Sequence, residues 1–170
     1  KKSLPSNRRT IMKQNYLHEM LELADDQKDK LATAFEKVIS LNGWVNVEPV
    51  VEDDSRVETP GLFSWFSARG PQVPVGTLVF EGEDRLVSLG VSHGTGRNAS
   101  DILEHEGIHA PASWQLKQDH PKRGFVWEVR KEELVTNLAA DFLMEATYKL
   151  CPTPQERLWT AAVNLLDQTH

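Results

Sequence analysis

The chain is predicted to be an α+β protein, with a small mixed or antiparallel sheet packed against several helices. Three observations indicate this class. Residues 12–41 and 131–149 place apolar side chains at helical spacing, whereas shorter stretches alternate apolar and polar residues as half-buried strands do. A chain of 170 residues with 39% hydrophobic content can also bury a real core. We therefore expect a single domain over residues 12–170, preceded by a basic tail or linker over residues 1–11.

The helical stretch at residues 12–41 is expected to form one long helix, or two helices broken near Asp25-Asp26. Strands are predicted at residues 44–51, 75–80, 85–92 and 125–129. Pro49 indicates that the first of these is an edge strand, because proline cannot donate to the ladder. A last helix is expected at residues 153–168, with Thr153 as its N-cap.

Residues 105–109 read His-Glu-Gly-Ile-His, which is the pattern H-E-x-x-H. Residues four apart share one face of a helix, so His105 and His109 could bind one Zn²⁺ while Glu106 stands beside it as a general base. Two imidazoles leave the ion acidic enough to lower the pKa of a bound water to about 7. The motif predicts a zincin-like fold, in which the sheet packs against this H-E-x-x-H helix and further helices.

The metal helix is expected to begin at Ser100, a suitable N-cap, and to end just after His109. It is short and atypical. Gly107 costs about 1 kcal/mol in a helix interior, and Pro111 disfavours a helical conformation at the residue before it.

A zinc peptidase needs a third protein ligand and an open position for water. Glu133 is the candidate, on the helix expected over residues 131–149. Asn137 lies one turn later on the same helix face and could orient a ligand imidazole. The sequence therefore predicts two helices that bring His105, His109 and Glu133 to one zinc ion.

The motif His105-Glu106-x-x-His109, followed by Glu133-x-x-x-Asn137-x-Ala139-Ala140-x-Phe142-Leu143-Met144, resembles the ImmA/IrrE family of zinc metallopeptidases. The resemblance covers roughly residues 75–150. It implies His105, His109 and Glu133 as zinc ligands, Glu106 as catalytic base and Asn137 as a supporting residue. The members of this family are typically intracellular, and several act on helix-turn-helix transcriptional repressors.

The expected function is zinc-dependent hydrolysis of a protein or peptide, with a DNA-binding repressor as a candidate substrate by family analogy. His93, His120 and Tyr148 are candidates for stabilising the oxyanion, and His93 is preferred because it follows a strand that leads to the metal helix. Phe63, Trp65 and Phe66 occupy a long loop and either line a substrate groove or fill the core. An edge strand near the metal would be a track for an extended substrate.

Two alternatives to the peptidase remain open. One is a zincin-fold binding module that regulates a partner protein without cleaving it, although the intact Glu106 favours the enzyme. The other is a regulator in which the motif is accidental and no metal binds. Metal analysis separates these classes.

Composition limits the partners. A net charge of −6 and a pI near 5.5 argue against direct nucleic-acid binding, which relies on clustered cations. The single cysteine, Cys151, excludes an internal disulfide, and no stretch resembles a signal peptide or a membrane span. We therefore expect a cytoplasmic protein with no membrane contact.

Overall fold

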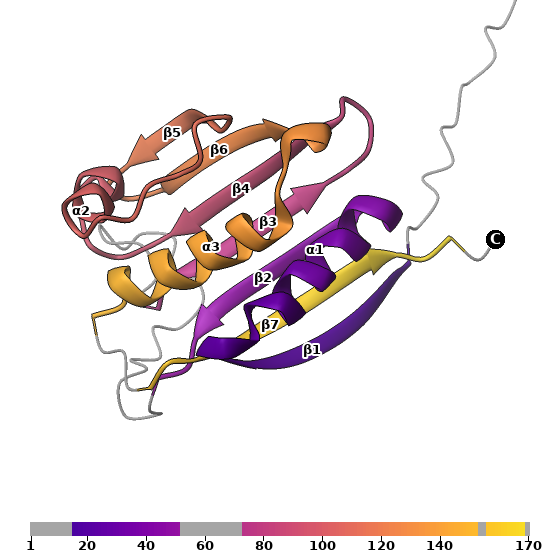
Figure 1. The fold of residues 1–170 in the computed structure, drawn as a ribbon, viewed down its shortest axis with the longest axis horizontal. Helices are drawn as coiled ribbons and strands as arrows, with labels where there is room; N and C mark the ends of the chain where they lie inside the picture. The colour runs from indigo at the N-terminus through magenta and orange to yellow at the C-terminus, as the bar shows by residue number, and fades with distance from the viewer. Residues whose placement is uncertain (1–14, 52–72, 153–155, 169–170) are drawn as a thin grey trace, which may run out of the picture.

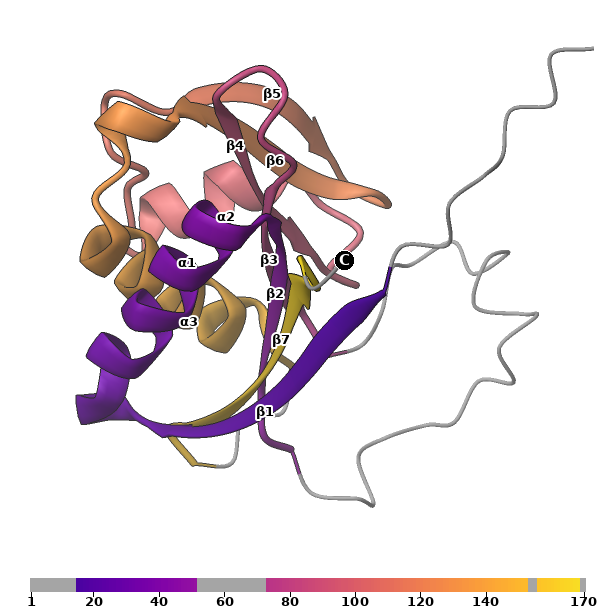
Figure 2. The same ribbon diagram turned by 90° about the vertical axis from the view of Figure 1, so that its right-hand side faces the viewer.

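The computed structural model describes residues 15–51, 73–152 and 156–168. These residues form a seven-stranded antiparallel sheet of order β1-β7-β2-β3-β4-β6-β5, with three α-helices on one face (Figures 1 and 2). The strands are β1 (Tyr16–Ala24), β2 (Gly43–Pro49), β3 (Val75–Phe80), β4 (Leu86–Ser92), β5 (Gln115–His120), β6 (Gly124–Arg130) and β7 (Leu158–Leu166). The helices are α1 (Lys28–Leu41), α2 (Ala99–His105) and α3 (Thr136–Leu150), with the 3₁₀ turns η1 (Asp25–Gln27) and η3 (Lys131–Glu133).

This architecture corrects the predicted zincin-like fold. The chain is dominated by one wide antiparallel sheet, and α2, a seven-residue helix at one end of it, contains only the first residue of the H-E-x-x-H segment. The long helices that cover the sheet are α1 and α3, neither of which carries the motif.

The central strands lie close to their predicted places because their alternation is strong. β2, β3 and β4 alternate buried and half-exposed residues along their whole length, as strands with one covered face must. The prediction that Pro49 marks an edge strand is wrong, since β2 pairs with β7 on one side and with β3 on the other. Pro49 is tolerated because it is the last residue of its strand.

Two segments expected to be helical are strands. Residues 16–24 form β1 rather than the first half of a long helix, and only the second half of that stretch becomes α1. The predicted last helix is β7, a central strand that pairs with β1 and β2. Its inward side chains, Trp159, Ala161, Val163 and Leu165, recur every second residue and are buried. This segment fits both the helical and the strand period, and pairing with β1 and β2 selects the strand.

The core lies between the sheet and the pair α1 and α3. Phe35 of α1, Leu143 and Met144 of α3 and Trp159 of β7 are fully buried in it. Trp159 donates its indole N–H to the hydroxyl of Thr147, at 3.2 Å, so the polar edge of the largest core side chain is satisfied.

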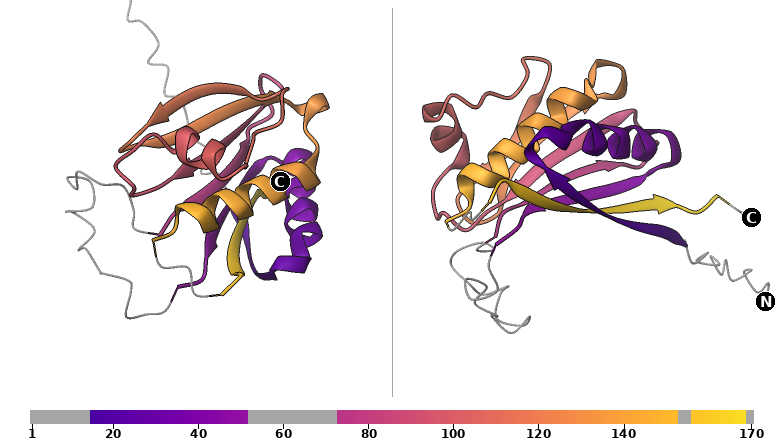
Figure 3. Two further views of the ribbon diagram at one scale, coloured as in Figure 1. Left: turned by 60° about the vertical axis from the view of Figure 1, so that its left-hand side comes forward. Right: turned by 60° about the horizontal axis from the view of Figure 1, so that its bottom comes forward.

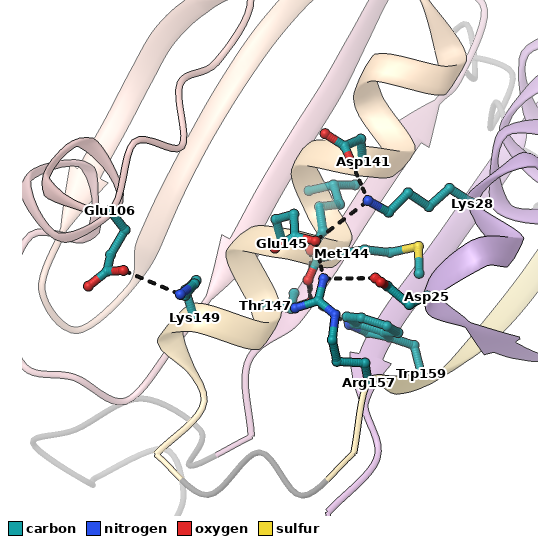
Figure 4. Close-up of polar contacts among 11 residues, drawn as sticks. Asp25, Lys28, Glu106, Asp141, Met144, Glu145, Thr147, Lys149, Arg157 and Trp159 are labelled. Atoms are coloured by element: carbon teal, nitrogen blue, oxygen red, sulfur yellow. Dashed lines mark hydrogen bonds and ion pairs between the residues drawn. The ribbon is translucent and has the colours of Figure 1, made fainter.

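A charged cluster closes the end of this core where α1, α3 and β7 meet (Figure 4). Arg157 pairs with Asp25 at 2.7 Å and with Glu145, and its guanidinium lies over the ring of Tyr148 at 4.7 Å. Lys28 of α1 pairs with Asp141 and, at 3.5 Å, with Glu145. The hydrogen bond from Arg157 lowers the pKa of Asp25, and the hydrogen bond to Asp141 raises the pKa of Lys28.

None of the helices in the described part of the chain is long and apolar enough to span a membrane. The predicted basic tail, and the loop residues Phe63, Trp65 and Phe66, lie outside the described residues.

Candidate functional site

The H-E-x-x-H segment folds as the end of a helix, not as a metal-binding helix face. α2 ends at His105, and Gly107 has a φ of +73°, in the left-handed region. The amide of Ile108 donates to the carbonyl of Leu103 at 2.8 Å, and that of Gly107 to Glu104 at 3.0 Å. These two bonds are the Schellman motif that closes many helices at a glycine. The expectation that the helix extends to His109 and ends just after it is therefore wrong.

The consequence for the two histidines is direct. His105 is the last helical residue and His109 lies in the following irregular segment, so the two no longer stand one turn apart on a helix face. Both are exposed. The carboxylate of Glu106, the expected base, pairs with Lys149 near the end of α3 at 3.3 Å (Figure 4).

Glu133 lies at the other end of the sheet. β4 starts at Leu86, opposite Arg130, and η3 follows Arg130 directly, whereas α2 follows the far end of β4 (Figure 1). Glu133 belongs to η3 and not to α3, so it shares no helix face with Asn137, which is exposed in the first turn of α3. Across the described ranges, no three His, Cys, Asp or Glu side chains are grouped to hold a metal ion. The residues predicted as zinc ligands do not fit a single site in this arrangement.

His93 is buried rather than open to a cleft. Its Nδ1 contacts the hydroxyl of Thr95 at 2.9 Å, while its Nε2 has no hydrogen-bond partner among the described residues. Oδ1 of Asp119 is also buried without a partner there, and Oδ2 of the same carboxylate accepts a hydrogen bond from Ser100. Burial lowers the pKa of His93, against a smaller raising effect of Asp119.

The other two oxyanion candidates have structural contacts. His120 accepts the amide of Lys122 at 3.1 Å in the turn between β5 and β6. Tyr148 packs against Trp159, with ring centroids 5.9 Å apart, beneath Arg157. These contacts place His120 in a hairpin turn and Tyr148 at the edge of the core.

What the fold does assemble near the motif is an apolar groove between α2, α3 and the β5–β6 hairpin. Two adjoining hollows share Ile108, His109 and Phe142. We call their combined lining the α2–α3 groove. It consists of Ser100, Leu103, Glu104, Gly107, Ile108, His109, Ala110, Pro111, Leu116, Trp127, Leu138, Asp141, Phe142 and Glu145.

The floor of the groove is aromatic. Trp127 and Phe142 meet edge to face with ring centroids 5.0 Å apart, and Trp114 packs edge to face on both, at 6.1 Å and 5.2 Å. All three rings are buried. The rim carries two large apolar side chains in solvent, Leu116 at 50% exposure and Leu138 at 51%.

The groove borders an edge strand. In the described part of the chain β5 pairs only with β6, so its outer edge carries unpaired backbone groups (Figure 3). Leu116 belongs to this strand and also lines the groove. A register shift between Leu116 and Gln118 bulges the strand at Lys117, whose ammonium pairs with Glu128 at 3.4 Å.

Sequence reasoning missed β5 because five of its six residues are polar. A signal was present in the segment that follows, where residues 121–123, beginning with Pro121, separate β5 from β6, and Gly124 at the start of β6 has a φ of +78°. A proline and a left-handed glycine at this spacing indicate a hairpin turn. The predicted strand at 125–129 therefore needed a partner immediately before it.

Fold and groove together define the class of protein: an antiparallel sheet with one helix-covered face and an apolar groove beside a free edge. Comparison with family models, curated proteins and solved structures found no match to this chain. The resemblance to the ImmA/IrrE family, and the zinc chemistry that it implies, stay predictions.

Proposed function

We propose that this protein is a binding module that holds an extended segment of a partner protein along the edge of β5, with apolar side chains of that segment in the α2–α3 groove. The observation that carries the proposal is the shared position of Leu116, on the free edge strand and in the groove lining at once. A segment that adds to β5 as a strand gains main-chain hydrogen bonds from the edge, and its alternate side chains meet the pocket beside it.

Exposure of the rim supports this function. Leu116 and Leu138 are each about half exposed beside buried aromatic rings, so together they extend the apolar floor outward into solvent. Contiguous apolar surface with a polar border is typical of interaction sites, because leaving it in water has a free-energy cost that a partner removes.

The charges on the border define the partner further. Glu104, Asp141 and Glu145 line the groove, and none of its lining residues in the described part of the chain is Lys or Arg. Lys28 pairs with Asp141, and Arg157 pairs with Glu145. Both cations come from the side of α3 that faces α1 and β7. The favoured partner segment therefore alternates apolar residues and carries Lys or Arg beside them.

The proposal is tested by selecting linear peptides from a random display library on the wild-type protein and on two variants, Leu116→Lys and Leu138→Lys. We expect the wild type to enrich alternating apolar peptides with flanking Lys or Arg, and each variant to weaken their binding by tenfold or more, since it places a cation on the rim. Leu41→Lys, at an exposed apolar position at the end of α1, is the matched control and should bind like the wild type.

Two outcomes would reject the binding module. The first is that selection enriches no peptide family above background, and the second is that the enriched peptides bind both rim variants as tightly as the wild type. Peptide cleavage that requires zinc and Glu106 would instead favour the metallopeptidase predicted from the sequence, in which case the groove would be its substrate track.

A further inference from the structure

The opposite edge of the sheet carries an interaction surface of a different kind. β1 is the outermost strand there and pairs only with β7 among the described strands (Figure 2). Two of its large apolar side chains lie in solvent, Met20 at 70% exposure and Leu17 at 57%. Met20 is the most exposed large hydrophobic residue in the described part of the chain.

The two exposed side chains point to opposite faces of the sheet. Successive residues of a strand alternate, so Leu17 shares the helix-covered face with Leu21 and Leu23, whereas Met20 shares the open face with His18 and Glu22. Strands that protect an edge usually carry charges or proline there. β1 carries the exposed charges Glu19 and Glu22 but no proline, and it also exposes apolar groups on both faces, so it can pair with a strand whose charges are complementary.

We propose that the occupant of this edge is a second copy of the same chain, bound by antiparallel pairing of β1 with β1 about a twofold axis at Met20. β1 has nine residues, and Met20 is the central one, so this register pairs the strand over its full length. The two sheets would then continue into one another across the axis.

This register is the one in which the side chains of β1 complement themselves. With Met20 facing Met20 of the second copy, the imidazole of His18 faces the carboxylate of Glu22, and Leu17 faces Leu23. Each of the last two pairs occurs twice because of the symmetry. His18 also contacts Asn164 of β7 within its own chain, which holds the ring on the open face.

The neighbouring registers are worse. Moving the axis to Glu19 places two glutamates directly opposite each other, and moving it to Leu21 places Met20 against Glu22. Both shifts also shorten the paired stretch. The Met20 register places Glu19 opposite Leu21, but it avoids the contact between two glutamates, pairs His18 with Glu22 and pairs the most residues.

Dimerisation through β1 leaves the proposed binding site free, because β5 lies at the far edge of the sheet. Two copies would present two α2–α3 grooves at the outer ends of one continuous sheet. A partner with two suitable segments would then bind more tightly than either groove alone allows. The dimer itself does not depend on the proposed function of the groove.

The first test is the mass of the full chain in solution, measured by light scattering or sedimentation over a range of concentrations. We expect a dimer for the wild type and for Leu138→Lys, which alters only the groove. Met20→Lys should weaken the dimer by tenfold or more, since it places two ammonium groups together at the axis. Met20→Lys should keep the circular dichroism spectrum of the wild type, because Met20 is exposed in the single chain, and its melting temperature should lose the concentration dependence that a dimer shows.

The second test addresses the register. Under mild oxidation Met20→Cys should form a disulfide between copies, whereas Glu19→Cys and Leu21→Cys should react far more slowly, because their own counterparts lie diagonally across the axis. The native Cys151 is buried, so the unmodified chain provides the background.

A charge exchange completes the design. Glu22→Lys alone should weaken the dimer about tenfold, and the double variant His18→Glu with Glu22→Lys should restore it. A wild type that stays monomeric at all concentrations, a dimer unaffected by Met20→Lys, or fastest crosslinking at Glu19 would overturn the proposal. Because Leu138→Lys and Met20→Lys act on opposite edges, loss of peptide binding and loss of the dimer are distinguishable.

Discussion

Gly107 decides how the H-E-x-x-H motif folds. A left-handed residue after a helix lets two amides satisfy the last carbonyls, and glycine adopts that conformation without strain from a Cβ. Gly107 was an unfavourable residue in the interior of the predicted metal helix, and in the structure it lies in the turn that ends this helix. His109 lies beyond this turn, so the spacing of four residues no longer places it on the same helix face as His105.

Two glycine substitutions test this account. Gly107→Ala should lower the free energy of unfolding by only about 1 kcal/mol, because its φ is positive but no atom lies within 4 Å of a new Cβ. Gly124→Ala should lower it by about 3 kcal/mol or more, because the Cβ would lie 2.1 Å from the carbonyl oxygen of Val91. Urea unfolding measures both. Equal effects would contradict the helix cap as the role of Gly107.

His93 should make stability depend on pH. Its pKa is lowered by burial, so in acid the unfolded chain takes up a proton that the native state resists. The contribution of neutral His93 to the free energy of unfolding is fully present above the ordinary histidine pKa of about 6.5, and it decreases as the pH falls below that value. We expect His93→Leu to unfold with a shallower pH dependence than the wild type between about pH 6.5 and 5, measured by urea titration. The same slope in both proteins would exclude His93 as the cause.

At the scale of elements, the end of the core depends on Arg157. Its guanidinium joins η1, α3 and β7 through Asp25 and Glu145, and it covers the rings of Tyr148 and Trp159, the latter at 5.6 Å. The ion pairs are partly exposed and contribute little by themselves, whereas the contact with two aromatic faces adds packing and cation–π attraction.

Arg157→Ala should therefore lower the free energy of unfolding by about 1–2 kcal/mol. Arg157→Lys should recover only part of this loss, because an ammonium stacks less well than a planar guanidinium. Thermal unfolding at low and high salt is the measurement. Complete rescue by lysine, or a loss that disappears in high salt, would indicate that charge alone mattered.

At the scale of the whole molecule, the sheet topology separates the residues that were predicted to bind zinc. Antiparallel pairing of β4 with β6 separates η3 from α2 by the length of these strands, so Glu133 and the two histidines lie at opposite ends of the sheet. We expect the purified protein to retain no stoichiometric zinc after dialysis, and His105→Ala and Glu133→Ala to leave its metal content unchanged. One zinc per chain, lost in both variants, would restore the metallopeptidase hypothesis.

The sequence by itself determined the strands whose pattern is local and strong. β3 lies at the predicted residues, and β2, β4 and β6 lie within a residue or two of them, because alternation of buried and exposed side chains requires only the strand period. The helices α1 and α3 were also indicated: α1 is the second of the two helices allowed by a break near Asp25-Asp26, and α3 begins five residues later than predicted.

Only the tertiary structure decided the rest. β7 is a strand because β1 and β2 flank it and supply its hydrogen bonds, and short apolar stretches do not reveal such distant partners. The positions of His105, His109 and Glu133 depend on where a helix cap falls and on which strands pair, and both are set by contacts between residues far apart in the chain. The H-E-x-x-H pattern therefore predicts zinc binding only where the fold keeps all five of its residues in one helix.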